Sequence, residues 1–227
     1  MIPASRLLRH LRRSRSGLAM TEFALAAPLL LTAGLWGAEV AWLALTHMRI
    51  SQTAMHIADN ASRIGDTSAL TQRKIYEHDL NDVFFGADIQ AGSGIDVFEH
   101  GRIIVSSQET IPGDPAKKQY IHWQRCMGKK DWASSYGKEG DGLDGNFKGM
   151  GPKGQEVEAY DEQDAVIFVE IAYDYRPLFS DMFVADTLIR AHSAFNVRDS
   201  RDLSQVYQRS TTNPDAVAGC DTFEALG

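Results

Sequence analysis

The sequence has few cysteines and prolines, and it lacks the local motifs of the common enzyme classes. Its 227 residues include two cysteines and seven prolines, while 44% are hydrophobic, so the chain can bury a core and does not have a disordered composition. No H-E-x-x-H metal pattern, G-x-S-x-G elbow, phosphate-binding loop or dinucleotide fingerprint occurs in it. Its seven histidines are scattered. We therefore predict no metal site, no cofactor and no enzymatic activity.

Basic residues are scarce beyond the N-terminus. Residues 1–17 contain five arginines and no acid, and without those five the remaining chain carries 18 basic and 30 acidic side chains, a net charge of −12. Because neutralising phosphates requires clustered lysine and arginine, this composition argues against a nucleic-acid partner. The five arginines are Arg6, Arg9, Arg12, Arg13 and Arg15.

One long apolar run follows the arginines. Only Glu22 and Glu39 are charged in residues 18–45, and about 20 apolar residues in a helix suffice to cross a bilayer core. The preceding arginines place the N-terminus in the cytoplasm by the positive-inside bias. An acid near the start of the run and the lack of an A-x-A site argue against removal by ordinary signal peptidase. We predict a basic cytoplasmic leader at 1–17 and a transmembrane helix at 18–45.

Helical periodicity continues beyond the apolar run. Apolar residues recur at i, i+3, i+4 and i+7 over 50–64. One helix is therefore expected from residue 18 to about residue 63, with a transmembrane half and an amphipathic half. We assign residues 46–66 to this helix extension, which would pack on an outer domain. Glu39, flanked by two tryptophans, is expected at the outer interface of the membrane.

The remaining residues, 67–227, are predicted to form an extracytoplasmic α+β domain. A second helix is expected over about 68–85, and after Gly92 the period changes to two. We expect strands at 95–98 and 103–107, joined as a hairpin through 99–102, and further strands at 120–127, 164–175 and 188–198. The last two are expected to be antiparallel neighbours. The predicted fold class is α+β, with the long N-terminal helix packed on an antiparallel β-sheet.

Three local features leave open a binding site in this domain. The loop 137–154 contains seven glycines, and Asp141, Asp144 and Asn146 within it have the oxygen ligands that calcium prefers. Their spacing does not fit the EF-hand register, so we predict a solvated loop. His122 and His192 each fall on the more polar face of a predicted strand, where surface positions are expected, although the two faces could meet across the sheet.

Both cysteines, Cys126 and Cys220, follow the apolar run. In an oxidising compartment an even pair favours a disulfide. Closing a loop of this length would stabilise the fold by roughly 4–5 kcal/mol. Two unrelated free thiols are the alternative.

The basic leader, Gly17, Leu18-Ala19-Met20-Thr21-Glu22-Phe23 and the apolar run together resemble a type IV prepilin processing site. The resemblance implies that a prepilin peptidase cuts after Gly17 and leaves Glu22 as the fifth mature residue. It also implies that Glu22 pairs with the new terminal amine of a neighbouring subunit, and a buried carboxylate is tolerated when such a charge neutralises it. Leu18 replaces the phenylalanine or methionine common at the first mature position, a departure that bears on N-methylation more than on cleavage.

The stretch Thr21–Leu31, with Pro28, is similar to the N-terminus of TadE-like pseudopilins of the tight-adherence (Flp, type IVb) pilus system. A weaker similarity covers 164–203, which ends in Arg-Asp-x-Arg-Asp-Leu at 198–203. The resemblance implies a pilin-like minor pseudopilin of the bacterial inner membrane with a periplasmic C-terminal domain. Its implied partners are the prepilin peptidase and other pilins or pseudopilins. The alternative is an uncleaved, membrane-anchored periplasmic scaffold or binding protein, and the sequence leaves open whether the subunit enters a filament.

Overall fold

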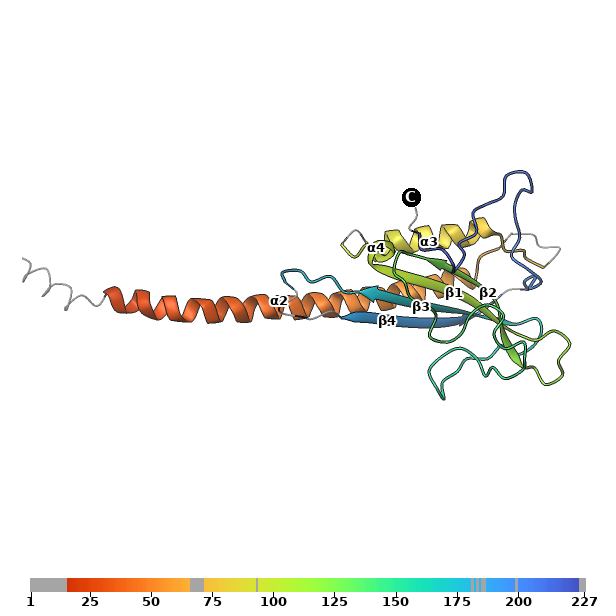
Figure 1. Ribbon diagram of the computed structural model, residues 1–227, viewed down its shortest axis with the longest axis horizontal. Coiled ribbons are helices and arrows are strands. Elements are labelled where there is room, and N and C mark those ends of the chain that lie inside the picture. The colour runs from red at the N-terminus through yellow and green to blue at the C-terminus, as the bar shows by residue number, and fades with distance from the viewer. Residues whose placement is uncertain are drawn as a thin grey trace, which may run out of the picture. The chain divides into compact units, whose positions relative to one another are not determined.

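The computed structural model describes residues 16–65, 72–92, 94–180, 182, 184, 187–198 and 200–224. Its elements in chain order are α2 (Ser16–Ala61), α3 (Glu77–Ala91), α4 (Val97–His100), β1 (Gly101–Thr110), β2 (Gln119–Met127), β3 (Ala165–Asp174) and β4 (Leu188–Asn196) (Figure 1). These elements belong to two compact units. One contains α2 through Leu43 together with Pro177–Ala185, and the other contains Ala44–Arg176 and the chain from Asp186 onward. The five arginines of the leader lie outside the described residues.

Helix α2 is continuous for 46 residues, which confirms the predicted single long helix. The last carbonyls of a helix lack intrahelical partners. Here the buried guanidinium of Arg201 donates to the carbonyl oxygens of Ala61 at 3.2 Å and Ile64 at 2.7 Å. The Arg-Asp-x-Arg-Asp-Leu segment therefore contributes the side chain that closes the C-terminal end of α2.

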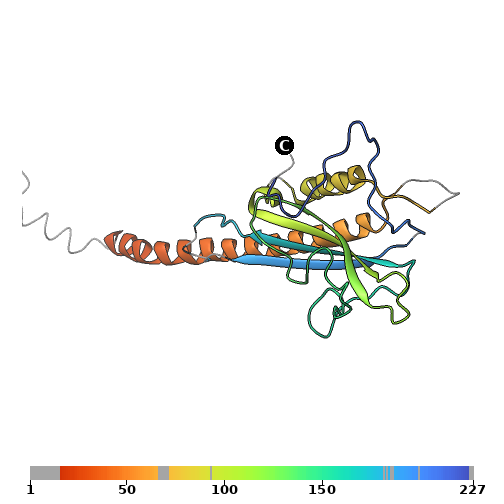
Figure 2. The same cartoon turned by 45° about the vertical axis from the view of Figure 1, so that its right-hand side comes forward.

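The four strands form one antiparallel sheet in the order β2-β1-β3-β4. The strands predicted at 120–127, 164–175 and 188–198 correspond to β2, β3 and β4 with ends shifted by one or two residues. The pairing of β3 with β4, predicted from their alternating patterns, is also confirmed. Figure 2 shows the strands side by side, with β4 at one edge.

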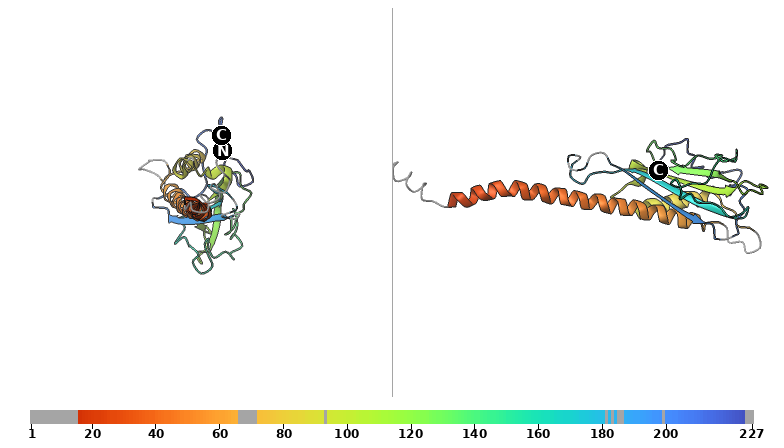
Figure 3. Two further views of the ribbon diagram at one scale, coloured as in Figure 1. Left: turned by 90° about the vertical axis from the view of Figure 1, so that its left-hand side faces the viewer. Right: turned by 90° about the horizontal axis from the view of Figure 1, so that it is seen from below.

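The sheet is covered on both faces within the second unit. One face packs against α3 and the C-terminal part of α2, and Figure 3 shows both helices on the same side of the sheet. The buried residues of that part of α2 are Ile50, Ala54, Ile57, Ala58 and Ala61. On the other face Ile121, Phe168 and Met150 form a buried cluster with side chains of the glycine-rich region, including Phe147 and Val157. This double coverage explains why every residue of β3 except Asp174 is buried. The predicted α+β class and helix-on-sheet packing are confirmed.

The predicted helix at 68–85 is displaced toward the C-terminus. Residues 66–71 lie outside the described part of the chain, and 72–76 are extended. Arg73 and Tyr76 form parallel bridges with Arg201 and Tyr207, and these long-range backbone bonds compete with helix formation. Helix α3 begins at Glu77. The Asp79 carboxylate accepts the backbone N–H of Tyr76, the residue before the helix, at 2.9 Å and so caps the N-terminus of α3.

The predicted hairpin at 95–107 is wrong. Residues 97–100 form the helical turn α4, and β1 pairs instead with β2 and β3. Gly101, expected as the turn residue, is extended with φ −140°. A Cβ there would lie 2.6 Å from the carbonyl oxygen of Val97 and 2.8 Å from that of Ala172. This glycine permits close packing of α4 against β3 and does not reverse the chain.

The C-terminal segment is held to the sheet by two side chains. Cys126 on β2 forms a disulfide with Cys220, which confirms the predicted bond. The guanidinium of Arg102, only 1% exposed, donates to the carbonyl oxygens of Gly128, Cys220 and Thr222 at 2.8–3.0 Å. The described part of the C-terminal segment, 202–224, is thus held to the sheet although no helix or strand occurs in it.

Substituting Arg102 by methionine is expected to lower the free energy of unfolding by about 2–4 kcal/mol, because three carbonyl acceptors lose a charged donor. The matched control is Arg190→Met on β4, whose side chain is exposed and whose loss should change stability by less than about 0.5 kcal/mol. Urea unfolding of the detergent-solubilised chain, followed by circular dichroism, measures both values. Equal stability of the two variants would contradict the role assigned to Arg102.

Candidate functional site

The residues of the predicted processing site occupy the first turns of α2. Leu18 is 62% exposed, and the hydroxyl of Thr21 donates to its carbonyl oxygen at 2.8 Å. A Cβ added to Gly17 would meet no atom within 4 Å. Glu22 is exposed, and no other described residue forms an ion pair with it. Neither backbone conformation nor packing within the described chain therefore accounts for Gly17 or Glu22.

The N-terminal part of α2 presents apolar side chains outward. Among the described residues α2 is the one helix long and apolar enough to cross a membrane, and its most apolar window has no buried residue. Its large exposed side chains include Phe23, Leu25, Leu29, Leu30, Leu31 and Trp36. An exposed surface of this kind requires lipid or other apolar helices around it.

Glu39 interrupts this exposed stretch. It is completely buried, and its carboxylate accepts the backbone N–H groups of Leu178 and Phe179 at 2.9–3.1 Å. Hydrogen bonds to an ionised acceptor are stronger than neutral ones. The sequence places Glu39 near a membrane boundary, but it gives no sign of partners about 140 positions away.

The sheet carries a second polar cluster, at the β1–β2 pair. Glu109 is 4% exposed; its Oε1 accepts the Ser107 hydroxyl at 2.7 Å and its Oε2 lies 2.9 Å from Nδ1 of His122. Glu109 and Tyr120 line a pocket of about 270 Å³, and burial raises the pKa of Tyr120 to about 12. Because the carboxylate lies between the serine and the histidine, the imidazole cannot act as a base on that hydroxyl. The arrangement stabilises the sheet end and does not form a nucleophilic triad.

His122 makes the stability of this cluster dependent on pH. The hydrogen bond to Glu109 raises the pKa of His122, against an opposing effect of burial. A histidine with a raised folded-state pKa stabilises fully below its unfolded pKa of about 6.5, and this contribution is lost as pH rises through the folded pKa. We therefore expect the free energy of unfolding to fall as pH rises above about 6.5, through the raised pKa of His122. Both His122→Gln and Glu109→Gln should flatten this slope in urea titrations, and an unchanged slope would contradict the assignment.

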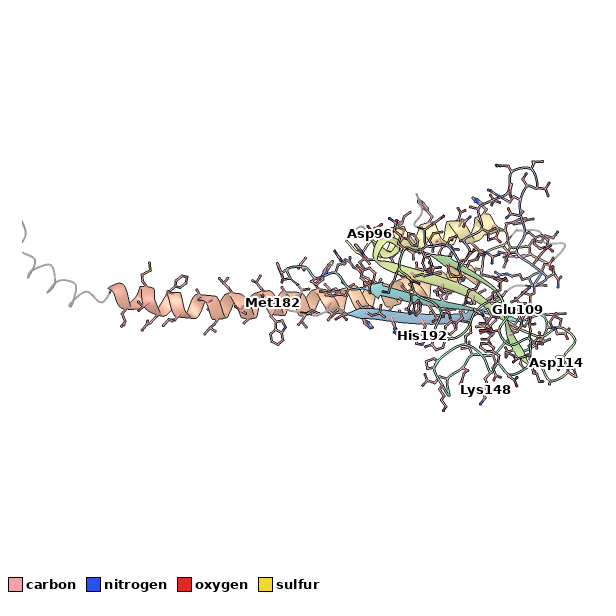
Figure 4. All side chains as sticks on the ribbon, viewed as in Figure 1. Asp96, Glu109, Asp114, Lys148, Met182 and His192 are labelled. Carbon is pink, nitrogen blue, oxygen red and sulfur yellow. A yellow bond between two sulfur atoms is a disulfide. The ribbon has the colours of Figure 1, made fainter. Side chains whose placement is uncertain are left out.

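His192 lies apart from this cluster. It is on β4 (Figure 4). Its ring stacks on that of Phe168 with centroids 6.0 Å apart. Since β2 and β4 are the two outer strands of the sheet, His192 does not meet His122, and the possible joint site is not formed. Across from His192, Glu170 accepts the hydroxyl of Ser134 and the N–H of Ser135, and burial raises the pKa of Glu170.

The acidic residues of the glycine-rich loop are occupied by local contacts. Asp144 accepts the backbone and side-chain N–H groups of Asn146, both at 3.1 Å, and these bonds lower the pKa of Asp144. Asp141 accepts the N–H of Lys138 at 2.9 Å. In the part of the chain that the structure describes, no three His, Cys, Asp or Glu side chains gather as a metal site would require. The loop packs on the sheet through Phe147, while most of its residues are exposed or half-buried.

Comparisons with protein-family models, with curated proteins and with solved structures gave no match to this chain. The residues with no structural explanation within the described chain, Gly17 and Glu22, both lie at the start of α2.

Proposed function

We propose that this chain is a minor pseudopilin that takes part in the biogenesis of a tight-adherence pilus. In this proposal a prepilin peptidase cuts after Gly17, and α2 then anchors the mature chain in the bacterial inner membrane. The observation that carries the proposal is the start of α2, where Gly17 and Glu22 have no structural explanation within an otherwise apolar, exposed helix.

The glycine supports the proposal because folding does not require it. Gly17 is the second described residue of α2, and glycine is a poorer helix former than alanine. The space around Gly17 is open, so any side chain would fit. A recognition requirement of a peptidase gives a reason for the glycine that folding does not. Of the described residues, a cut at this position removes only Ser16 and Gly17 and leaves the rest of α2 intact.

The carboxylate supports assembly with other subunits. A charge inside a membrane helix is expensive unless it is neutralised, and Glu22 projects from a helix whose neighbouring side chains are apolar. The amine of Leu18, created by cleavage on an adjacent subunit, would supply the opposite charge. Glu22→Ala should therefore impair pilus assembly more than it impairs membrane insertion.

The disulfide supports an extracytoplasmic location for the sheet domain. Disulfides persist in oxidising compartments such as the periplasm and are rare in the cytosol, and Cys126 is bonded to Cys220. With the five arginines of the leader on the cytoplasmic side, the chain would cross the inner membrane once. The domain at 67–227 would then lie in the periplasm.

Intact-mass analysis of the membrane-extracted protein tests the proposal. In cells with an active prepilin peptidase, the mature chain should begin at Leu18, and in cells without that peptidase it should retain the leader. A chain that begins at Met1 in both strains would overturn the proposal. That result would favour the alternative of an uncleaved membrane-anchored scaffold or binding protein.

A further inference from the structure

The segment Pro177–Ala185, which connects β3 to β4, is unusually apolar for a surface connection. Its sequence is PLFSDMFVA, with one charged residue, Asp181. Leu178, Phe179 and Met182 are exposed by 52%, 50% and 88% of their surfaces. Clustered exposure of large apolar side chains marks an interaction surface. We call Pro177–Ala185 the apolar connection.

Hydrogen bonds join the backbone of the apolar connection to one side chain of α2. Both carboxylate oxygens of Glu39 accept the N–H of Leu178, at 3.0 and 3.1 Å, and one also accepts the N–H of Phe179 at 2.9 Å. Glu39 has no exposed surface. These bonds fix the backbone of Leu178 and Phe179 beside Glu39, and they leave both side chains half exposed.

From Glu39 the connection extends along the apolar stretch of α2. Met182 lines an apolar pocket with Leu29, Thr32, Ala33 and Trp36, and Figure 4 shows Met182 beside the helix. These helix residues precede Glu39 by three to ten positions, roughly 5–15 Å along the helix axis at 1.5 Å per residue. The connection and the membrane-spanning stretch thus present one continuous apolar surface.

We infer that the apolar connection is a second membrane-contacting element, which inserts Leu178, Phe179 and Met182 into the outer leaflet beside the spanning helix. The inference rests on the membrane anchoring by α2 that is part of the proposed function. If Leu18 marks the inner boundary, about 20 helical residues reach the outer boundary near Glu39. Met182, beside Leu29–Trp36, then lies at the depth of the lipid rather than in water.

The single charged residue of the connection limits how deeply the connection can enter the membrane. A charged side chain costs little near the membrane interface and much more at the midplane. The one acid in the sequence of this segment, Asp181, lies outside the described residues, and its charge would be tolerated at an interface but not at the midplane. Lipid is favoured as the occupant because this surface continues that of α2, whose most apolar window is entirely unburied.

Site-directed fluorescence in vesicles tests the inference. Because both native cysteines are in the disulfide, an introduced cysteine is the only free thiol of the full chain. Met182→Cys is labelled with a nitrobenzoxadiazole dye and reconstituted into vesicles of phosphatidylethanolamine and phosphatidylglycerol, with or without a set of lipids that carry a doxyl quencher at acyl-chain positions from the headgroup to the bilayer centre. Leu29→Cys in the spanning stretch and Lys153→Cys at an exposed site of the sheet domain are the matched controls.

The Met182→Cys label should emit at shorter wavelength than the Lys153→Cys label. Doxyl lipids should quench it about as strongly as they quench the Leu29→Cys label. If Met182→Cys behaves like Lys153→Cys while Leu29→Cys is quenched, the connection lies in water and the inference is overturned, although the anchor stands. If Leu29→Cys is also unquenched, membrane anchoring by α2 fails and the inference fails with it.

Discussion

Replacing Cys126 and Cys220 together by alanine is expected to lower the free energy of unfolding by about 4–5 kcal/mol. The two residues are separated by 94 positions, and a crosslink over that distance removes a large loop-closure entropy from the unfolded chain. Single domains are stable by roughly 5–15 kcal/mol in total. The loss would therefore remove a large part of the stability of the sheet domain, and urea unfolding in detergent would show it as a lower midpoint.

The disulfide acts together with the contacts around it. The N–H of Cys126 donates to the carbonyl of Ala218, and Arg102 holds the carbonyl of Cys220. We therefore expect the last residues of the variant to become accessible to carboxypeptidase before the sheet unfolds. Reducing the wild-type protein with dithiothreitol should produce the same loss of stability. A double variant as stable as the oxidised wild type would show that the bond contributes nothing.

The elements that sequence predicts well are those whose pattern is set by a local environment. In β4 the alternation of buried Ile189 and Ala191 with exposed Arg190 and His192 follows from one covered face. Helix α2 is equally evident, because its apolar run is longer than any other in the chain. Such patterns are visible without knowledge of distant partners.

The predictions are wrong where contacts with residues far away in the sequence determine the local structure. Arg73 is extended because it pairs with Arg201, and no local pattern announces that pairing. Gly101 was expected in a turn, but close approach of Val97 and Ala172 explains it instead. The contacts of Glu39 are of the same kind, since its partners come from the segment that follows β3, about 140 positions along the chain.

Some residues of the candidate site can be recognised from the sequence, and others only in the folded chain. Gly17 and Glu22 are recognisable because the glycine directly precedes the apolar run and the glutamate interrupts it, and the structure adds that neither is explained by contacts within the described chain. The apolar connection is recognisable only after folding. Its residues are recognised because Glu39 binds their backbone to α2.

Gly17→Leu is expected to abolish processing while it leaves the fold unchanged. Leucine is a better helix former than glycine by most of a kcal/mol, roughly 0.8, and the position has open space on all sides. The substitution cannot therefore act by disrupting α2. Intact-mass analysis should find the entire leader retained on Gly17→Leu in cells whose peptidase matures the wild-type chain.

The matched control is Gly34→Leu, at a glycine of the same helix that is equally open. It makes the same chemical change within the same apolar stretch, so it should be matured like the wild type. Membrane fractionation should recover both variants in the membrane, because leucine favours insertion. A mature Gly17→Leu chain that begins at Leu18 would remove the basis for the processing site. Loss of maturation in both variants would locate the defect in the helix as a whole, whereas loss in Gly17→Leu alone would assign the glycine to recognition by the peptidase.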